Sequence, residues 1–172
     1  MKIIVSHDVD HLYGSDHYKD LIYPKLWVRE TLSFLKRNIT FSQWWRRLLG
    51  VFSRERNYIE QLMKYDEGNG IPSSFYFGMD NILGMSYKYI KAIPYIKKLQ
   101  SHGFDVGVHG ASFDDEESML IEFNRFKEIA GVSPLGIRMH YVRHDDETFE
   151  KLSRCGYLYD ATEFVKIEGT CL

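Results

Sequence analysis

The stretch "KIIVSHDVDHLYG", residues 2–14, joins an apolar run directly to a dense group of ionisable side chains. Ile3, Ile4 and Val5 lead, after one serine, into two aspartates and two histidines within five residues. Charged groups at this density are costly to bury unless something neutralises them. The stretch therefore predicts a buried strand that ends either on a solvated loop or at a bound cation.

Four further runs have the character of strands, and they alternate with helical patterns. A continuously apolar first run is typical of a strand buried on both faces of a parallel sheet. We expect strands at residues 2–7, 73–79, 105–109, 135–141 and 157–164, and helices within 25–66, 87–102, 112–131 and 145–156. Regular alternation of strand and helix predicts an α/β fold with a parallel sheet.

The composition is that of one globular domain, residues 1–172. Hydrophobic residues make up 44% and charged residues 27% of the chain, which is enough for a single core. The formal net charge of −2 predicts no nucleic-acid partner, and two cysteines are too few for a disulfide framework. No run approaches the roughly 20 apolar residues of a membrane span, and no signal peptide precedes the first strand. We therefore expect a cytoplasmic protein.

Polar side chains recur where the expected strands end. Asp8, Asp10 and His11 follow the first strand, His109 ends the third, and the fourth carries Arg138 and His140. Active sites of α/β proteins form at the carboxyl edge of the sheet, where the ends of parallel strands meet. We expect these side chains to lie at one such site.

Asp8 and Asp10 share one face of an extended segment. Two carboxylates this close repel each other unless a cation or an arginine neutralises them. A divalent metal bound by Asp10 and an imidazole would do so, and would leave Asp8 as an ionised base held by a bidentate pair with Arg138. The alternative is an Asp-x-Asp turn whose carboxylates only cap backbone amides.

Three stretches carry motifs as well as single residues: SHDVDH (6–11), VGVHGASFDD (106–115) and GIRMHYVRHDDETFEKLSRCGYLYDAT (136–162). They resemble, in this order, the T-F-D-D-G, H-[ST]-x-x-H and R-x-P-[YFW] motifs of the polysaccharide deacetylases of carbohydrate esterase family 4. The third stretch is particularly similar to an uncharacterised branch of that family with HDVDH and GxRxHYxR motifs. The resemblance covers nearly the whole chain apart from residues 20–66.

The resemblance implies a distorted (β/α) barrel of about seven strands. It implies an activity that removes acetyl groups from N-acetylated sugars in a polysaccharide or its precursor, using zinc or another divalent ion. By position, Asp8 would be the catalytic base, Arg138 its partner, and Asp10 and His109 metal ligands. The alternative function is a catalytically degenerate protein of the same fold that binds carbohydrate or a protein partner.

The third metal ligand is open. The second histidine of H-[ST]-x-x-H falls at Phe113, so the candidates are His11, His140 and Asp114. Either histidine would alternatively supply a general acid. His140 lies two residues from Arg138 on the same expected strand, so both side chains would face the site. The other interpretation of His140 is a packed, hydrogen-bonded histidine.

We expect about five strand–helix units in this chain, whereas the family has about seven. We also expect a helical insertion at about 20–66. The C-terminal part of the family's barrel, which supplies a general acid, is expected to be missing. An edge strand near 157–163 would be covered by residues 166–172 or by a second copy of the chain, which would make a homo-oligomer. Residues 25–56 hold eight Lys or Arg against two Glu. We expect their aromatic stripe to pack on the barrel, and docking on a membrane surface or a polyanionic glycan is the alternative.

Overall fold

The computed structural model describes residues 4–17, 21–52, 57–85, 87–131 and 135–163. The chain divides into two compact units. The first comprises Met1–Asp10 and Ile59–Leu172, and the second comprises His11–Tyr58.

The first unit is built on a parallel sheet with the strand order β1-β2-β3-β4-β5. The strands are β1 (Val5–Val9), β2 (Ser73–Gly78), β3 (Asp105–Gly110), β4 (Gly136–Met139) and β5 (Tyr159–Asp160). The helices are α3 (Ile59–Gly68), η3 (Tyr89–Ala92), α4 (Ile93–Ser101), α5 (Glu116–Ala130), η4 (His140–Val142) and α6 (Thr148–Cys155). This alternation confirms the predicted α/β class and the parallel sheet.

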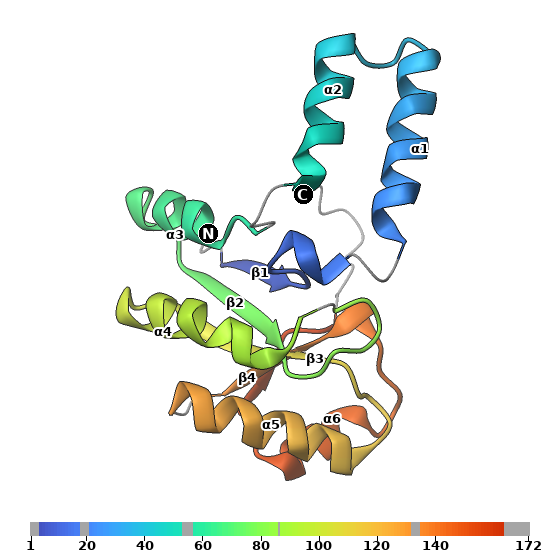
Figure 1. The fold of residues 1–172 in the computed structure, drawn as a ribbon. Helices are drawn as coiled ribbons and strands as arrows, with labels where there is room; N and C mark the ends of the chain where they lie inside the picture. Colours follow the sequence, from blue (N-terminus) through green and yellow to red (C-terminus); the bar gives the residue numbers. More distant parts are fainter. Residues whose placement is uncertain (1–3, 18–20, 53–56, 86, 132–134, 164–172) are drawn as a thin grey trace, which may run out of the picture. The chain divides into compact units, whose positions relative to one another are not determined.

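Sequence neighbours are also neighbours in the sheet, and Figure 1 shows β1 to β4 side by side in chain order. A parallel sheet in strict chain order is the arrangement of a (β/α) barrel. In the described residues the sheet is open, because β1 and β5 each pair with a single neighbour. The segment 166–172, expected to cover the β5 edge, lies outside the described residues.

The first strand differs from its prediction. It runs from Val5 to Val9, and its residues alternate in exposure instead of being continuously buried. Ile4 is 65% exposed. The interior strand β2, in contrast, is buried along its whole length, with Phe75 and Phe77 fully enclosed. The prediction of a buried strand at residues 2–7 was wrong because an apolar run does not reveal whether a strand lies at the edge of a sheet.

Helix ends follow local signals that the sequence contains. The Asp115 side chain accepts a hydrogen bond from the Glu117 amide and caps α5, and Gly131 ends that helix with a φ of 73°. Pro94 occupies the first turn of α4, where its missing N–H costs no hydrogen bond. The proline thus marks a late helix start instead of a kink.

The second unit contains a helical hairpin of α1 (Ile22–Leu35) and α2 (Phe41–Leu49), with the short helices η1 (Gly14–His17) and η2 (Gly50–Phe52). Thr40 begins α2 with a capping box, in which its side chain and that of Gln43 each bind the other's backbone N–H. Glu30 accepts hydrogen bonds from Arg29 and from Arg47, which joins the two helices. Among the described residues, no helix is both long and apolar enough to cross a membrane.

Candidate metal site

The carboxyl edge of the sheet brings together most of the side chains singled out in the sequence. Asp10 follows β1, His109 lies near the end of β3, and His140 follows β4. His109 stands opposite Arg138 in the β3–β4 register. Parallel register therefore aligns these positions along one edge.

Three side chains converge at this edge. The Asp10 Oδ1 atom lies 3.3 Å from His109 Nε2 and 3.5 Å from His140 Nδ1. The two ring nitrogens are 2.8 Å apart. Both histidines are buried, with exposed fractions of 2% and 5%, whereas Asp10 is half-buried. These three ligand atoms lie within 4.8 Å of one another and fit a divalent metal ion.

The tautomers of both histidines follow from their outer hydrogen bonds. His109 Nδ1 lies 2.9 Å from the Arg138 carbonyl oxygen, and His140 Nε2 lies 2.9 Å from the Leu83 carbonyl oxygen. A carbonyl oxygen can only accept, so each of these nitrogens carries the proton. The other two nitrogens, His109 Nε2 and His140 Nδ1, face each other and lie beside Asp10. A backbone carbonyl that accepts from the outer ring nitrogen is a usual way in which a protein fixes the tautomer of a metal-binding histidine.

The spacing of the three atoms can be compared with that of a metal site. Tetrahedral zinc with ligand bonds of about 2.0–2.1 Å separates neighbouring ligand atoms by about 3.3–3.4 Å. The two distances from Asp10 Oδ1, 3.3 and 3.5 Å, are close to this value. His109 Nε2 and His140 Nδ1 are 2.8 Å apart, which is less than this separation between the ligand atoms of a zinc ion. At 2.8 Å the two nitrogens are at hydrogen-bonding distance, and a cation bound by both would replace that contact.

Asp8 lies beside this cluster. Its Oδ1 is 3.9 Å from His109 Nδ1, and its Oδ2 is 3.5 Å from Arg138 Nε. The Arg138 Nη1 group donates to the Ser6 hydroxyl. The contact at 3.5 Å is longer than the hydrogen bonds of a bidentate pair, so the bidentate geometry predicted for Asp8 and Arg138 was wrong. What the two side chains do share is proximity and opposite charge.

Backbone strain gathers around the cluster. Leu83, whose carbonyl accepts from His140, has a φ of 55°, and Tyr141 and Val142 both have a φ of 57°. A non-glycine residue in this left-handed region costs on the order of 1–2 kcal/mol. Strain of this kind concentrates at functional sites, where surrounding contacts hold it. The Tyr141 ring is 69% exposed, and its centroid lies 4.0 Å from that of His140.

Glu122 is a part of this region that the sequence analysis missed. It is buried in α5, and both carboxylate oxygens accept from the amide of Ala111, two residues after His109. Burial, reinforced by the charge of Asp80, raises the pKa of Glu122 to about 7. The sequence signal was available, because Glu122 lies three residues after Met119 and four before Phe126 on the buried face of the helix.

The other candidates for a third ligand have different positions. Phe113, where the motif expects a histidine, lies with its ring under the Arg143 guanidinium at 4.3 Å. Asp114 is exposed, and its carbonyl accepts a hydrogen bond from Lys151. His11 is the first residue of the second unit. The roles assigned to Asp8, Asp10, His11, His109, Arg138 and His140 therefore stay predictions, and His140 is the candidate that the structure groups with Asp10 and His109.

Comparison with known proteins supports the fold. No protein-family model and no curated protein matches the chain. Among solved structures, it is similar to that of a "putative polysaccharide deacetylase" from Mycobacterium smegmatis, with a TM-score of 0.55 and 20% sequence identity. The match covers 92% of this chain and 50% of that one, so the chain spans about half the length of its structural neighbour. The expected α/β fold, with a parallel sheet in the strand order of a (β/α) barrel and similar to that of a protein described as a polysaccharide deacetylase, is thereby confirmed.

Proposed function

We propose that the chain carries the metal site of a hydrolase that removes acetyl groups from an N-acetylated sugar, in a polysaccharide or its precursor. The observation that supports this most directly is the pair of histidines whose outer nitrogens donate to backbone carbonyls. Their inner nitrogens meet the carboxylate of Asp10. The similarity of fold to a protein described as a deacetylase favours this activity over other metal-dependent hydrolysis.

Asp10, His109 and His140 would hold the ion. Two imidazoles and one carboxylate suit zinc, which leaves a fourth position open in its catalytic sites. A divalent ion bound there would act as a Lewis acid on the amide carbonyl of the substrate.

Asp8 is placed to act as the base. It lies on the same edge of the sheet, is partly exposed, and has Arg138 Nε at 3.5 Å from its Oδ2 atom. As a carboxylate it would take the proton of the attacking water. Tyr141, an exposed aromatic side chain next to His140, presents a surface on which a sugar ring would stack.

The alternative is a degenerate protein that only binds carbohydrate or a partner. The discriminating feature is the third ligand, because a site reduced to Asp10 and His109 would not retain zinc, whereas one completed by His140 would. If His140 is a ligand, it does not also serve as the general acid. Without a general acid the rate falls on the order of 10²–10⁴. We therefore expect the 172-residue chain to bind metal and to release acetate slowly, and fast release would indicate that another group, such as His11, supplies the acid.

The test combines metal content with acetate release. The chain is purified, loaded with zinc or cobalt, and assayed on chitin oligomers and peptidoglycan fragments, beside Asp8→Asn. We expect one ion per chain in both proteins and acetate release only in the chain with Asp8 intact. Tight metal binding with no acetate release from any N-acetylated substrate would favour the degenerate alternative. A chain that retains no metal would contradict the proposal itself.

A further inference from the structure

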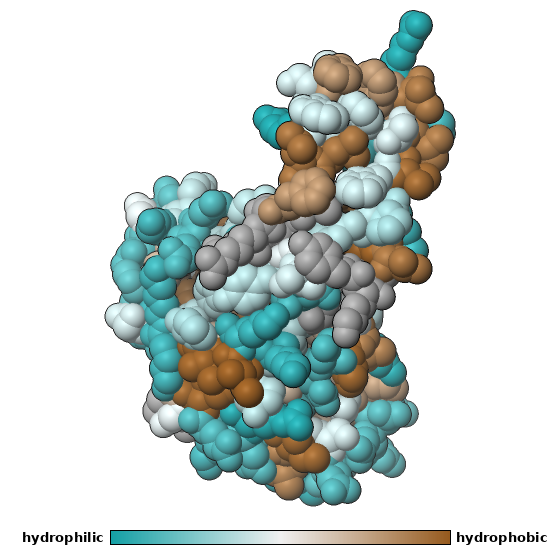
Figure 2. Space-filling model, viewed as in Figure 1, coloured by the Kyte–Doolittle hydropathy of each residue, from teal (hydrophilic) through white to brown (hydrophobic). Residues whose placement is uncertain are grey.

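The hairpin of α1 and α2 exposes an unusual amount of apolar surface. No residue of α2 is buried, and α1 buries only Tyr23 and Glu30. The exposed apolar side chains, with their exposed fractions, are Val28 (62%), Leu32 (50%), Leu35 (69%), Phe41 (62%), Trp45 (50%) and Leu49 (49%). Figure 2 shows apolar side chains over both helices of the hairpin. We call these six residues the apolar stripe.

The hairpin's internal packing leaves much of this stripe exposed. Trp44 of α2 stacks on Phe34 of α1 at 5.3 Å between ring centroids, and its indole N–H donates to Thr31. Phe41 of the stripe adds an edge contact with Phe34 at 6.0 Å and is still 62% exposed. Along α1, Val28, Leu32 and Leu35 are spaced i, i+4, i+7, and along α2, Phe41, Trp45 and Leu49 are spaced i, i+4, i+8. The two halves of the stripe meet at the turn, because Leu35 ends α1 and Phe41 begins α2.

Positive charge accompanies the apolar stripe. Residues 21–52 contain six Lys or Arg and one Glu, although the whole chain has a formal net charge of −2. Glu30 forms ion pairs with Arg29 and Arg47, and the hydrogen bond from Arg47 is the main cause of the lowered pKa of Glu30. The remaining cations, Lys25, Lys36, Arg37 and Arg46, are exposed and form no ion pair with any residue in the described part of the chain.

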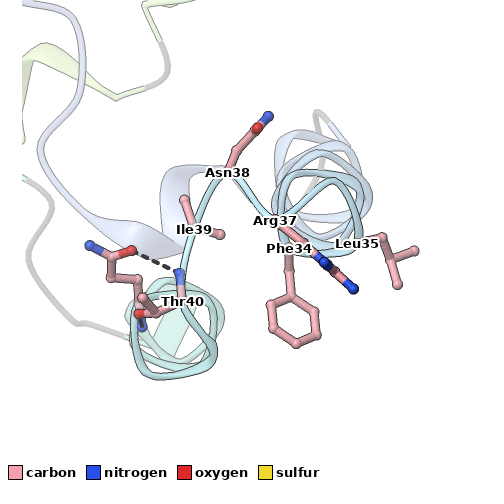
Figure 3. A pocket seen from close by; sticks show the side chains of 7 residues that line it. Phe34, Leu35, Arg37, Asn38, Ile39 and Thr40 are labelled. Atoms are coloured by element: carbon pink, nitrogen blue, oxygen red, sulfur yellow. Dashed lines mark hydrogen bonds between the residues drawn. The ribbon is translucent and has the colours of Figure 1, made fainter.

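Arg37, in the turn between α1 and α2, has a strained backbone conformation. Arg37 has a φ of 59°, a left-handed conformation in which glycine is favoured. In Figure 3, Arg37 and Leu35 point away from the turn, which also lines a hollow of about 440 Å³. Glycine would adopt this conformation at a lower conformational energy. The presence of an arginine there indicates that its guanidinium group has a role besides ending the helix.

We infer that the tip of this hairpin docks on the surface of an anionic lipid bilayer. Leu35, Phe41 and Trp45 would enter the interface between headgroups and acyl chains, and Lys36 and Arg37 would bind anionic headgroups. Aromatic and aliphatic side chains flanked by unpaired cations are the features of helices that lie in a membrane interface without crossing it. A polyanionic glycan would bind the cations but would leave the apolar stripe exposed to water, so charge and apolar surface together favour the bilayer.

The experiment measures binding of the full chain to vesicles of phosphatidylcholine with and without phosphatidylglycerol. The three tryptophans of the chain, Trp27, Trp44 and Trp45, all lie in the hairpin, so intrinsic tryptophan fluorescence reports on this unit alone. We expect sedimentation with the anionic vesicles, a blue shift of the emission, and loss of both at high salt.

Two variants and one control sharpen the test. Arg37→Gly should raise the melting temperature, because glycine adopts the left-handed conformation without strain. It should also weaken vesicle binding roughly fivefold, which is the contribution of one Lys or Arg side chain to the affinity for an anionic membrane. Leu35→Ser should weaken binding while leaving the fold intact. Leu158→Ser, which changes an equally exposed leucine in the first unit, should bind like the original chain.

Three results would overturn the inference. The first is no binding to anionic vesicles at low salt, or equal binding by all four proteins. The second is dimerisation in solution that Leu35→Ser abolishes, which would assign the surface to a second copy of the chain. The third is binding to a polyanionic glycan such as heparin without any binding to vesicles, which would assign the cations to a different ligand.

Discussion

The buried carboxyl group of Glu122 makes the stability of the chain depend on pH in a way that a single substitution removes. Burial raises its pKa from an ordinary value of 4.5 to about 7 in the folded chain. Each pH unit between these values is worth about 1.4 kcal/mol. Ionising Glu122 in the folded chain therefore costs about 3 kcal/mol relative to the unfolded chain.

The sign of the effect follows from the raised pKa. The contribution of protonated Glu122 to stability is complete below pH 4.5 and is lost as the pH rises through about 7. Glu122→Gln cannot ionise and keeps an oxygen that accepts from the Ala111 amide. We expect the free energy of unfolding of Glu122→Gln, relative to that of the original chain, to rise by about 1.4 kcal/mol per pH unit between pH 5 and 7 and to level off above.

Urea unfolding of both proteins at half-unit steps from pH 5 to 8, with chelator present, measures this difference. Subtracting the two curves removes the contribution of every other titrating group that the substitution does not disturb. A difference that stays constant within about 0.5 kcal/mol over this range would refute the reasoning, because it would mean that Glu122 does not change its protonation on unfolding.

Three further outcomes follow from the structure. Arg138→Met should lower acetate release by about 10–100-fold with unchanged metal content, since it removes the charge that orients Asp8, and a loss of metal would contradict this. Gly107→Ala should destabilise the chain by about 1–3 kcal/mol in urea unfolding, because its Cβ would lie 2.7 Å from the Gly136 carbonyl oxygen. Gly68→Ala, with no atom within 4 Å of the new Cβ, is the matched control. Thr40→Ala removes the cap of α2 and should lower helix content by circular dichroism, at a cost of about 1 kcal/mol.

The location of the site could be predicted because it depends on regular geometry. Parallel strands align their carboxyl ends, so Asp10 after β1 and His109 in β3 meet at one edge although about 100 residues separate them. The polar residues at strand ends indicated this edge before any contact was known. The same reasoning identified the fold, since alternation of strand and helix permits few other arrangements.

The third candidate ligand and the groups that support it could not be predicted in the same way. His140 lies beyond β4 in a short turn followed by Tyr141 at a φ of 57°, and no local pattern predicts that conformation. The partner of His140 is the backbone carbonyl of Leu83, and every residue has such a carbonyl. Edge strands pose a related difficulty, because the apolar run at residues 3–5 looks the same whether a strand has one neighbour or two.

Zinc titration of the chelator-treated chain tests the central claim most directly. Isothermal titration calorimetry of the original chain, His140→Gln and His144→Gln would measure stoichiometry and affinity, His144 being an exposed histidine in the next loop that serves as the control. We predict one zinc ion per chain and unchanged binding in His144→Gln. In His140→Gln we predict a zinc affinity lowered by more than about 100-fold, because losing a ligand lowers the affinity more than losing a group that only hydrogen-bonds to a ligand. No zinc binding by the original chain, or equal binding by His140→Gln, would contradict the Asp10, His109 and His140 site.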